Sequence, residues 1–134
     1  MSDKISILVV DDERCIRRVL EYRLESEGFE VYSAFDGESG LKIARDKRPD
    51  VILLDWLMPK MNGMEVLSEL RHDERTKDII VFMLTAKNMM DDVEAALANG
   101  ANDYIIKPFE GDELGKRIMS MFKAVHMLHE ESVS

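Results

Sequence analysis

Four short runs of hydrophobic residues in this chain each end on a residue with a reactive side chain. The runs are residues 7–10, 51–54, 80–84 and 104–106, and the residues that follow them are Asp11, Asp55, Thr85 and Lys107. Short apolar runs without alternation are typical of parallel strands that helices cover on both faces. In such sheets the functional crevice lies at the carboxyl ends of the strands. The pattern therefore predicts a buried sheet with carboxylates, a hydroxyl and an ammonium group at one edge.

Segments with helical spacing of apolar residues separate these runs, so strand and helix patterns alternate from end to end. Such alternation is typical of an α/β fold with a parallel sheet. A further strand is expected at residues 30–34, and the last helix is expected to start near Glu110 and to fray at residues 130–134. The pattern predicts a doubly wound, five-stranded parallel sheet with five helices. The apolar stripe of the first helix is expected to comprise Ile16, Val19, Leu20 and Leu24.

Length and charge narrow the function classes. The chain has 134 residues, enough for one domain with a core, and a formal charge of −9. An acidic balance argues against nucleic acid, which needs a basic footprint, and against an anionic membrane surface. We therefore expect no direct nucleic-acid binding and no membrane contact. No signal peptide is expected, because residues 1–4 lead directly into a strand, and no membrane span is expected, because no apolar stretch approaches about 20 residues.

The only cysteine is Cys15, so no intramolecular disulfide can form. This fits a reducing cytosol, and we expect a cytoplasmic protein. Because Cys15 falls within a helical pattern and free cysteines are commonly buried, a structural thiol is favoured over a reactive one.

The polar residues at the strand ends suggest phosphoryl chemistry. Asp11 and Asp12 are adjacent, and past a strand end the chain turns, so both can reach the crevice near Asp55. At about 5 Å and an effective dielectric of about 20, each pair of carboxylates repels by roughly 3 kcal/mol. Either one proton is retained or a cation binds, and a few carboxylates with several waters describe Mg²⁺ better than Ca²⁺ or Zn²⁺.

Asp55 is the best candidate nucleophile, because a carboxylate can form an aspartyl-phosphate. Lys107 adds a positive charge for a phosphate oxygen or for Asp55 itself, and the hydroxyl of Thr85 can donate to a phosphoryl oxygen. Taken singly, an Asp at a strand end is usually a helix cap or a turn former, and a lysine is usually solvated. The coincidence of all these groups at the ends of core strands favours a phosphoryl or metal site.

Four motifs together resemble the receiver domain of two-component response regulators. They are Asp11-Asp12, Asp55 with Met58-Pro59 and Asn62-Gly63, Thr85-Ala86, and Lys107-Pro108-Phe109. The resemblance covers roughly residues 4–123, so we expect a receiver domain at residues 1–123 and a helical extension or truncated linker at residues 124–134. It implies the flavodoxin-like fold with strand order 2-1-3-4-5.

The resemblance implies that Asp55 accepts a phosphoryl group from a sensor histidine kinase or a histidine phosphotransfer protein. Mg²⁺ would be bound by Asp12, Asp55 and the backbone carbonyl of Leu57, with Asp11 acting through a water. Lys107 would contact the phosphoryl group, and its bond to Pro108 is expected to be cis.

The resemblance also implies a switch. Thr85 would move toward the phosphoryl group and Tyr104 would turn inward, which changes the face that binds partners. The downstream partner would be a protein target or a fused output domain, and phosphorylation-dependent homodimerisation is a further expectation. Because the apolar Leu57 cannot orient an attacking water, we expect a moderately long-lived phosphorylated form.

Other functions remain open at this point. A Mg²⁺-dependent phosphohydrolase of the haloacid dehalogenase type usually has a second Asp two residues after the nucleophile, where this chain has Leu57. The hypothesis of a flavodoxin-like cofactor carrier is rejected, because Asp11-Asp12-Glu13 would repel the phosphate of the cofactor. A degenerate receiver that serves as a protein-binding scaffold stays possible, as do a stand-alone regulator and a piece of a longer one. No separate turnover substrate is expected, so the chain is not predicted to be an enzyme in that sense.

Overall fold

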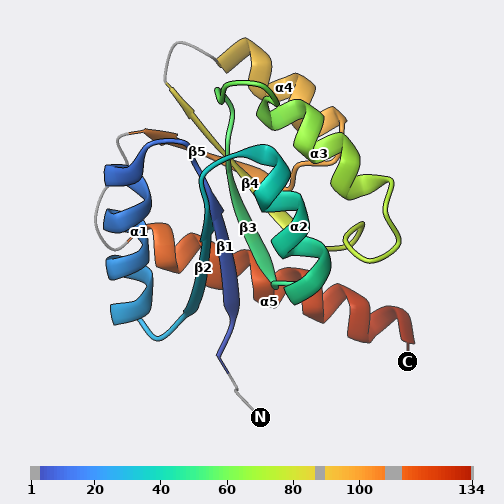
Figure 1. Ribbon diagram of the computed structural model, residues 1–134. Coiled ribbons are helices and arrows are strands. Elements are labelled where there is room, and N and C mark those ends of the chain that lie inside the picture. The colour runs from blue at the N-terminus through green and yellow to red at the C-terminus, as the bar shows by residue number, and fades with distance from the viewer. Residues whose placement is uncertain (1–3, 87–89, 108–112, 134) are drawn as a thin grey trace.

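Strands and helices alternate along the whole described chain (Figure 1). This computed structural model describes residues 4–86, 90–107 and 113–133, and only the backbone of residues 90, 91 and 128–133. The strands are β1 (Ser6–Val10), β2 (Glu30–Ala34), β3 (Val51–Asp55), β4 (Ile80–Ala86) and β5 (Asp103–Lys107). The helices are α1 (Arg14–Ser26), α2 (Gly37–Lys47), α3 (Gly63–Arg71), α4 (Met90–Ala98) and α5 (Glu113–Val133). The predicted α/β alternation is confirmed.

The strands form one parallel sheet in the order β2-β1-β3-β4-β5, which confirms the expected topology. The order reverses between β1 and β3, which are neighbours in the sheet although β2 lies between them in sequence. In α/β sheets, such a reversal leaves a crevice at the carboxyl ends of the two strands. The register places Val10 beside Leu54, and Asp55 beside Leu84. Asp11 and Asp55 therefore leave the sheet side by side.

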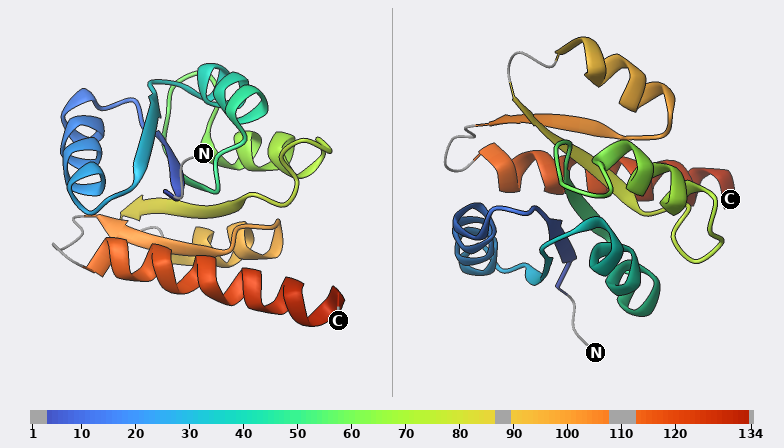
Figure 2. Two further views of the ribbon diagram at one scale, coloured as in Figure 1. Left: turned by 90° about the horizontal axis from the view of Figure 1, so that it is seen from below. Right: turned by 45° about the horizontal axis from the view of Figure 1, so that its top comes forward.

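Helices cover both faces of the sheet (Figure 2). The side chains of α1 and α5 pack on one face with Ile7, Val9, Leu53 and Phe82. The side chains of α2, α3 and α4 pack on the other face with Leu8, Val10, Leu54 and Met83. Every residue of β3 is buried, because this strand lies in the middle of the sheet under both helical layers. Alternate strand residues therefore serve opposite cores, which explains the unbroken apolar runs.

Local capping sets the ends of helices α2 and α3. The Asp36 carboxylate accepts a 2.8 Å hydrogen bond from the backbone N–H of Ser39 and so caps α2. Asn62 and Glu65 form a reciprocal capping box at the start of α3. These contacts satisfy helix N–H groups that have no partner within the helix. At the other end of α2, Arg48 adopts a left-handed conformation with φ 46°.

Three expectations about the helices are wrong. Val19 is 53% exposed, because α1 buries only a narrow stripe of side chains and Val19 lies outside that stripe. Cys15 is exposed in the first turn of α1, so it is not a buried structural thiol. The backbone of α5 continues to Val133, so the helix includes most of the segment expected to fray. Across the described part of the chain, no helix combines the length and apolar character of a membrane span.

Candidate functional site

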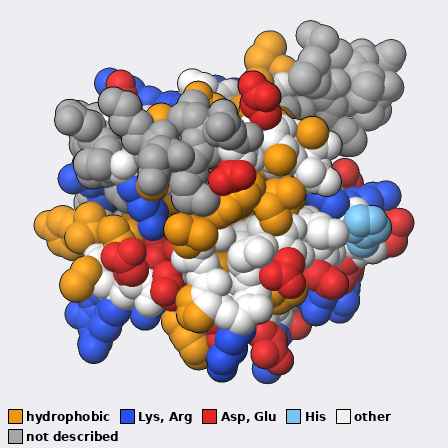
Figure 3. Space-filling view, turned by 90° about the horizontal axis from the view of Figure 1, so that it is seen from above, with side chains coloured by type: hydrophobic (Ala, Val, Ile, Leu, Met, Phe, Trp, Pro, Cys, Tyr) orange, Lys and Arg blue, Asp and Glu red, His pale blue; other side chains and the backbone are white. Residues whose placement is uncertain are grey.

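Three carboxylates meet at the carboxyl edge of the sheet, where β1 and β3 end. Oxygens of Asp11, Asp12 and Asp55 all lie within 4.8 Å of one another. Asp11 is fully buried and Asp55 is 6% exposed, whereas Asp12 is exposed to solvent. Figure 3 views this edge from above and shows acidic and hydrophobic side chains close together around it. The predicted convergence of the three residues is present in the structure.

Lys107, at the end of β5, supplies the positive charge nearest to this cluster among the described residues. Its Nζ donates a 2.8 Å hydrogen bond to Oδ2 of Asp11 and a 3.2 Å hydrogen bond to Oδ1 of Asp55. Burial opposes the charged form, but the hydrogen bond to Asp11 and the charges of Asp55 and Asp11 outweigh it, so the pKa of Lys107 is raised. Lys107 therefore stays an ammonium ion that bridges two strand ends.

Burial and the charge of Asp11 raise the pKa of Asp55 to about 6, against the opposing effect of Lys107. Burial is the larger cause, and a surplus of negative charge adds to it, since one lysine faces three carboxylates. Near pH 7 the Asp55 carboxylate is mostly ionised, yet its ionisation costs free energy. A group in this state binds added positive charge readily.

Asp11 and Asp12 are not equivalent in the structure. Both oxygens of Asp11 are occupied, because Oδ2 faces Lys107 and Oδ1 accepts a 2.9 Å hydrogen bond from the backbone N–H of Glu13. Asp12 faces solvent instead. Asp12 and Asp55 are therefore the carboxylates that are open to an incoming cation, because both oxygens of Asp11 already accept hydrogen bonds.

The cluster fits a hard divalent cation. Carboxylate oxygens converging within a few ångströms match the ligands of Mg²⁺, which keeps several waters. No cysteine or histidine belongs to this group of described residues, so the donors do not favour a soft metal. Leu57 lies two residues beyond Asp55, and its side chain is 62% exposed.

The two expected switch residues lie near the site but do not contact Asp55 through any hydrogen bond seen in the described part of the chain. Thr85 is 2% exposed, and its hydroxyl donates a 3.3 Å hydrogen bond to the carbonyl of Ala86. Tyr104 is partly buried against the core formed with α2, α3 and α4, and its carbonyl accepts a hydrogen bond from Arg117. Pro108 lies outside the described residues, as does its expected cis bond to Lys107.

Gly63 also belongs to the site, although the motif Asn62-Gly63 predicts no particular role for it. Its backbone N–H donates a 2.9 Å hydrogen bond to the carbonyl of Trp56, which closes the loop after β3. A Cβ at Gly63 would lie 2.6 Å from the carbonyl oxygen of Asp55. Only glycine permits this approach of α3 to the Asp55 peptide. The Asn-Gly pair ahead of a helix was the available signal, but it is also an ordinary turn signature.

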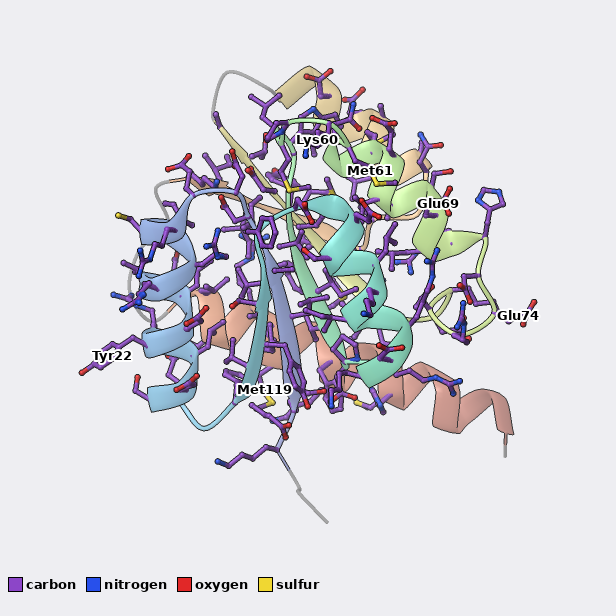
Figure 4. All side chains as sticks on the ribbon, in the orientation of Figure 1. Tyr22, Lys60, Met61, Glu69, Glu74 and Met119 are labelled. Carbon is purple, nitrogen blue, oxygen red and sulfur yellow. The ribbon has the colours of Figure 1, made fainter. Side chains whose placement is uncertain are left out.

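A separate hollow lies between α2 and α3, away from the acidic cluster. Its volume is about 270 Å³, and its lining includes Leu41, Arg45, Lys60, Met61 and Glu69. Figure 4 shows Glu69 on α3 and Lys60 and Met61 in the loop ahead of it, whereas Tyr22 points from α1 into solvent. Arg45 is already paired with Glu69 and Asp73 in this region. The hollow contains none of the residues of the acidic cluster.

Comparisons with known proteins agree on one family. The model of the response regulator receiver domain matches residues 7–119. The chain is 45% identical over 122 residues to the probable transcriptional regulator ycf27 of Porphyridium aerugineum, which covers 91% of this chain and 50% of that protein. It is 39% identical to the DNA-binding dual master transcriptional regulator RpaA of Synechocystis, covering 87% of this chain and 48% of that protein. The chain thus spans about half the length of the curated relatives it matches.

Solved structures give the same result. Chemotaxis protein CheY4 of Vibrio cholerae superposes with a TM-score of 0.82 at 32% identity, covering 87% of this chain and 98% of that one. NtrX of Brucella abortus superposes with a TM-score of 0.89 at 30% identity, covering 96% of this chain and 29% of that one.

These relatives correct one expectation. The prediction of no direct nucleic-acid binding is wrong, because the curated relatives are named as transcriptional regulators and one is named as DNA-binding. The prediction relied on the net charge of −9 of these 134 residues. The matched relatives are about twice as long as this chain, so the net charge of these 134 residues does not describe the binding surfaces of the whole relatives.

Proposed function

This chain belongs to the response regulator receiver family, and we propose that it is a phosphorylation-activated signalling switch with Asp55 as the phosphoacceptor. The observation that carries the proposal is the Lys107 ammonium group, which bridges Asp11 and Asp55 inside a buried acidic cluster. This arrangement holds a nucleophilic carboxylate beside a positive charge that can meet the oxygens of a phosphoryl group.

In the proposed reaction an oxygen of Asp55 forms a bond to phosphorus while the bond from phosphorus to a histidine nitrogen breaks. Lys107 loses its contact with the Asp55 carboxylate and turns to an oxygen of the transferred group. Asp12, Asp55 and the carbonyl of Leu57 would hold Mg²⁺, with Asp11 linked to it through a water. When bound, the metal would neutralise charge on the transferred oxygens.

The proposed switch works through Thr85 and Tyr104. The Thr85 hydroxyl makes only a long 3.3 Å hydrogen bond to Ala86, so exchanging it for a phosphoryl oxygen costs little. Tyr104 is partly buried on β5, the strand next to the one that carries Thr85, so a shift of Thr85 would open room for its ring. These movements would bias an equilibrium between two conformations of the partner-binding face.

The proposed phosphodonor is a sensor histidine kinase or a histidine phosphotransfer protein. The curated relatives are named as transcriptional regulators. The proposed output of this receiver is therefore control of transcription. In this role the chain turns over no separate substrate. A cytoplasmic location, a receiver at residues 1–123 and an extension at residues 124–134 remain predictions.

The test is an intact mass measurement after incubation with acetyl phosphate and Mg²⁺. Wild type should gain one phosphoryl group, Asp55→Asn should gain none, and the exposed Asp46→Asn variant should match wild type. Omitting Mg²⁺ should abolish the gain. Continuous release of inorganic phosphate from phosphate esters would favour the phosphohydrolase instead. Failure to gain mass from acetyl phosphate or from any phosphohistidine donor would leave only the scaffold function.

A further inference from the structure

Arg17 reaches from the first turns of α1 back to the acidic loop. Its guanidinium donates a 2.7 Å hydrogen bond to the main-chain carbonyl of Asp11, six residues earlier, and the side chain is partly buried. The helix begins without a side-chain cap, since Glu13 makes no capping hydrogen bond. The loop between β1 and α1 therefore depends on other contacts for its conformation, and Arg17 provides one of them.

All four polar groups of Asp11 have partners. Its N–H donates to the carbonyl of Ala34 at 3.2 Å, one carboxylate oxygen faces Lys107, and the other accepts from Glu13. The fourth group is the carbonyl bound by Arg17. That carbonyl belongs to the peptide plane that joins Asp11 to Asp12. Because the plane is rigid, fixing its oxygen fixes the direction in which the chain continues into Asp12.

Asp12 is the exposed member of the acidic cluster, and so its own surroundings hold it less firmly than those of Asp11 and Asp55. We infer that Arg17 is a positioning residue for Asp12: it orients the Asp11–Asp12 peptide so that the Asp12 carboxylate faces Asp55 before a divalent cation arrives. The inference rests on the proposed function, since it concerns the ligands of the proposed Mg²⁺ site. Outer contacts of this kind typically change metal affinity by about 10- to 100-fold when they are lost.

Arg17 also brings positive charge toward the cluster, and the effect of that charge has to be separated from the effect of the hydrogen bond. The neighbouring Arg18 offers a matched control, because it carries the same charge in the same helical turn but is exposed. Arg17→Met removes both the charge and the donor, while Arg18→Met removes the charge alone. Arg17→Lys keeps the charge and a shorter donor, so it should recover part of the effect.

The experiment is a Mg²⁺ titration of wild type, Arg17→Met, Arg17→Lys and Arg18→Met. Binding is read from the amide shifts of Asp12 and Asp55 and from the emission of Trp56, the only tryptophan, which directly follows Asp55. Arg17→Met should raise the Mg²⁺ dissociation constant about tenfold or more, and Arg18→Met less than about twofold. At saturating Mg²⁺ the rate of phosphorylation by acetyl phosphate should return close to wild type in Arg17→Met, because Asp55 and Lys107 are unchanged.

Thermal unfolding of each variant shows whether a change in affinity merely follows loss of fold, and Arg17→Lys provides a second folded variant. Equal Mg²⁺ affinities of Arg17→Met and Arg18→Met would overturn the inference and leave the proposed function intact. A phosphorylation rate that stays low at saturating Mg²⁺ would also overturn it, because the defect would then lie beyond Asp12. If wild type itself binds no Mg²⁺, the proposed function fails and the inference fails with it.

Discussion

Replacing the phosphoacceptor should stabilise the metal-free protein. In the fold, burial and the charge of Asp11 raise the pKa of Asp55 from 3.8 to about 6. Ionised Asp55 is therefore unfavourable in the native state, and this difference corresponds to about 3 kcal/mol of unfolding free energy at neutral pH. Asp55→Asn removes the charge and keeps a carbonyl oxygen that can accept from Lys107. We expect the variant to be more stable than wild type by about 1–3 kcal/mol at pH 7.5 without metal.

The pH dependence fixes the sign of this effect. Below about pH 3.8 the carboxyl group is protonated in both the folded and unfolded states, so the stabilising contribution of the folded-state proton is fully present. As the pH rises to about 6, the unfolded chain has already released its proton while the folded protein still holds it, and stability falls. Above that value the loss is complete. The difference between Asp55→Asn and wild type should therefore grow between about pH 4 and 6.5 and then stay constant.

Urea unfolding in the presence of a chelator, repeated at several pH values, measures the difference directly. The exposed Glu94→Gln variant on α4 removes one acidic charge elsewhere and should differ from wild type by less than about 0.5 kcal/mol. Added Mg²⁺ should stabilise wild type more than Asp55→Asn and so shrink the gap. An Asp55→Asn variant that is less stable than wild type at pH 7.5, or a gap that does not change with pH, would refute the electrostatic argument.

Three further predictions concern other parts of the molecule. Lys107→Met should lower the rate of phosphorylation by acetyl phosphate by more than about 100-fold, seen by intact mass, because the ammonium group nearest to Asp55 is lost; a rate within threefold of wild type would contradict its role. Gly63→Ala should destabilise the fold by about 1–3 kcal/mol in urea unfolding, and more than Gly40→Ala, since its Cβ would meet the backbone of Asp55 rather than the side chain of Val10. Arg48→Gly should raise stability by up to about 1 kcal/mol, because φ 46° strains any residue with a Cβ, whereas Arg48→Ala should give no such gain.

The fold could be predicted from the sequence because its strands are buried on both faces. Each apolar run became a strand whose ends agree with the run to within about two residues, as in Val51–Asp55 for the run 51–54. The periodicity of the apolar residues in α1 predicted which side of the helix is buried, but not how many residues around the helix that buried side includes. The exposed positions of Val19 and Cys15 depend on how far the helix sits over the edge of the sheet, which spacing alone does not encode.

The membership of the acidic cluster was predictable, since parallel strands that end together bring their next residues together. The hydrogen-bond partners of each carboxylate oxygen in the cluster were not predictable. Which oxygen of Asp11 meets Lys107, and which meets the N–H of Glu13, depends on the turn after β1 and on side-chain rotamers. The role of Arg17 was not predictable either, because the sequence does not distinguish a partly buried arginine in an amphipathic helix from an exposed one.

The site is best understood as an incomplete balance of charge. One ammonium group faces three carboxylates, and the fold fixes two of the four charges, Lys107 and Asp11, against each other. The deficit of positive charge falls on Asp55 and adds to burial, which is the main cause of its raised pKa. A divalent cation would remove that deficit. A phosphoryl group on Asp55 would add negative charge farther from the strand end, and so would create a demand for positive charge at the phosphoryl oxygens. Because Lys107 ends β5 and contacts both Asp11 and Asp55, a change in this demand would act on β5, which carries Tyr104 and pairs with the strand that carries Thr85. The charge imbalance that contributes to the lower stability of the metal-free protein would thus also couple phosphorylation to a change in shape.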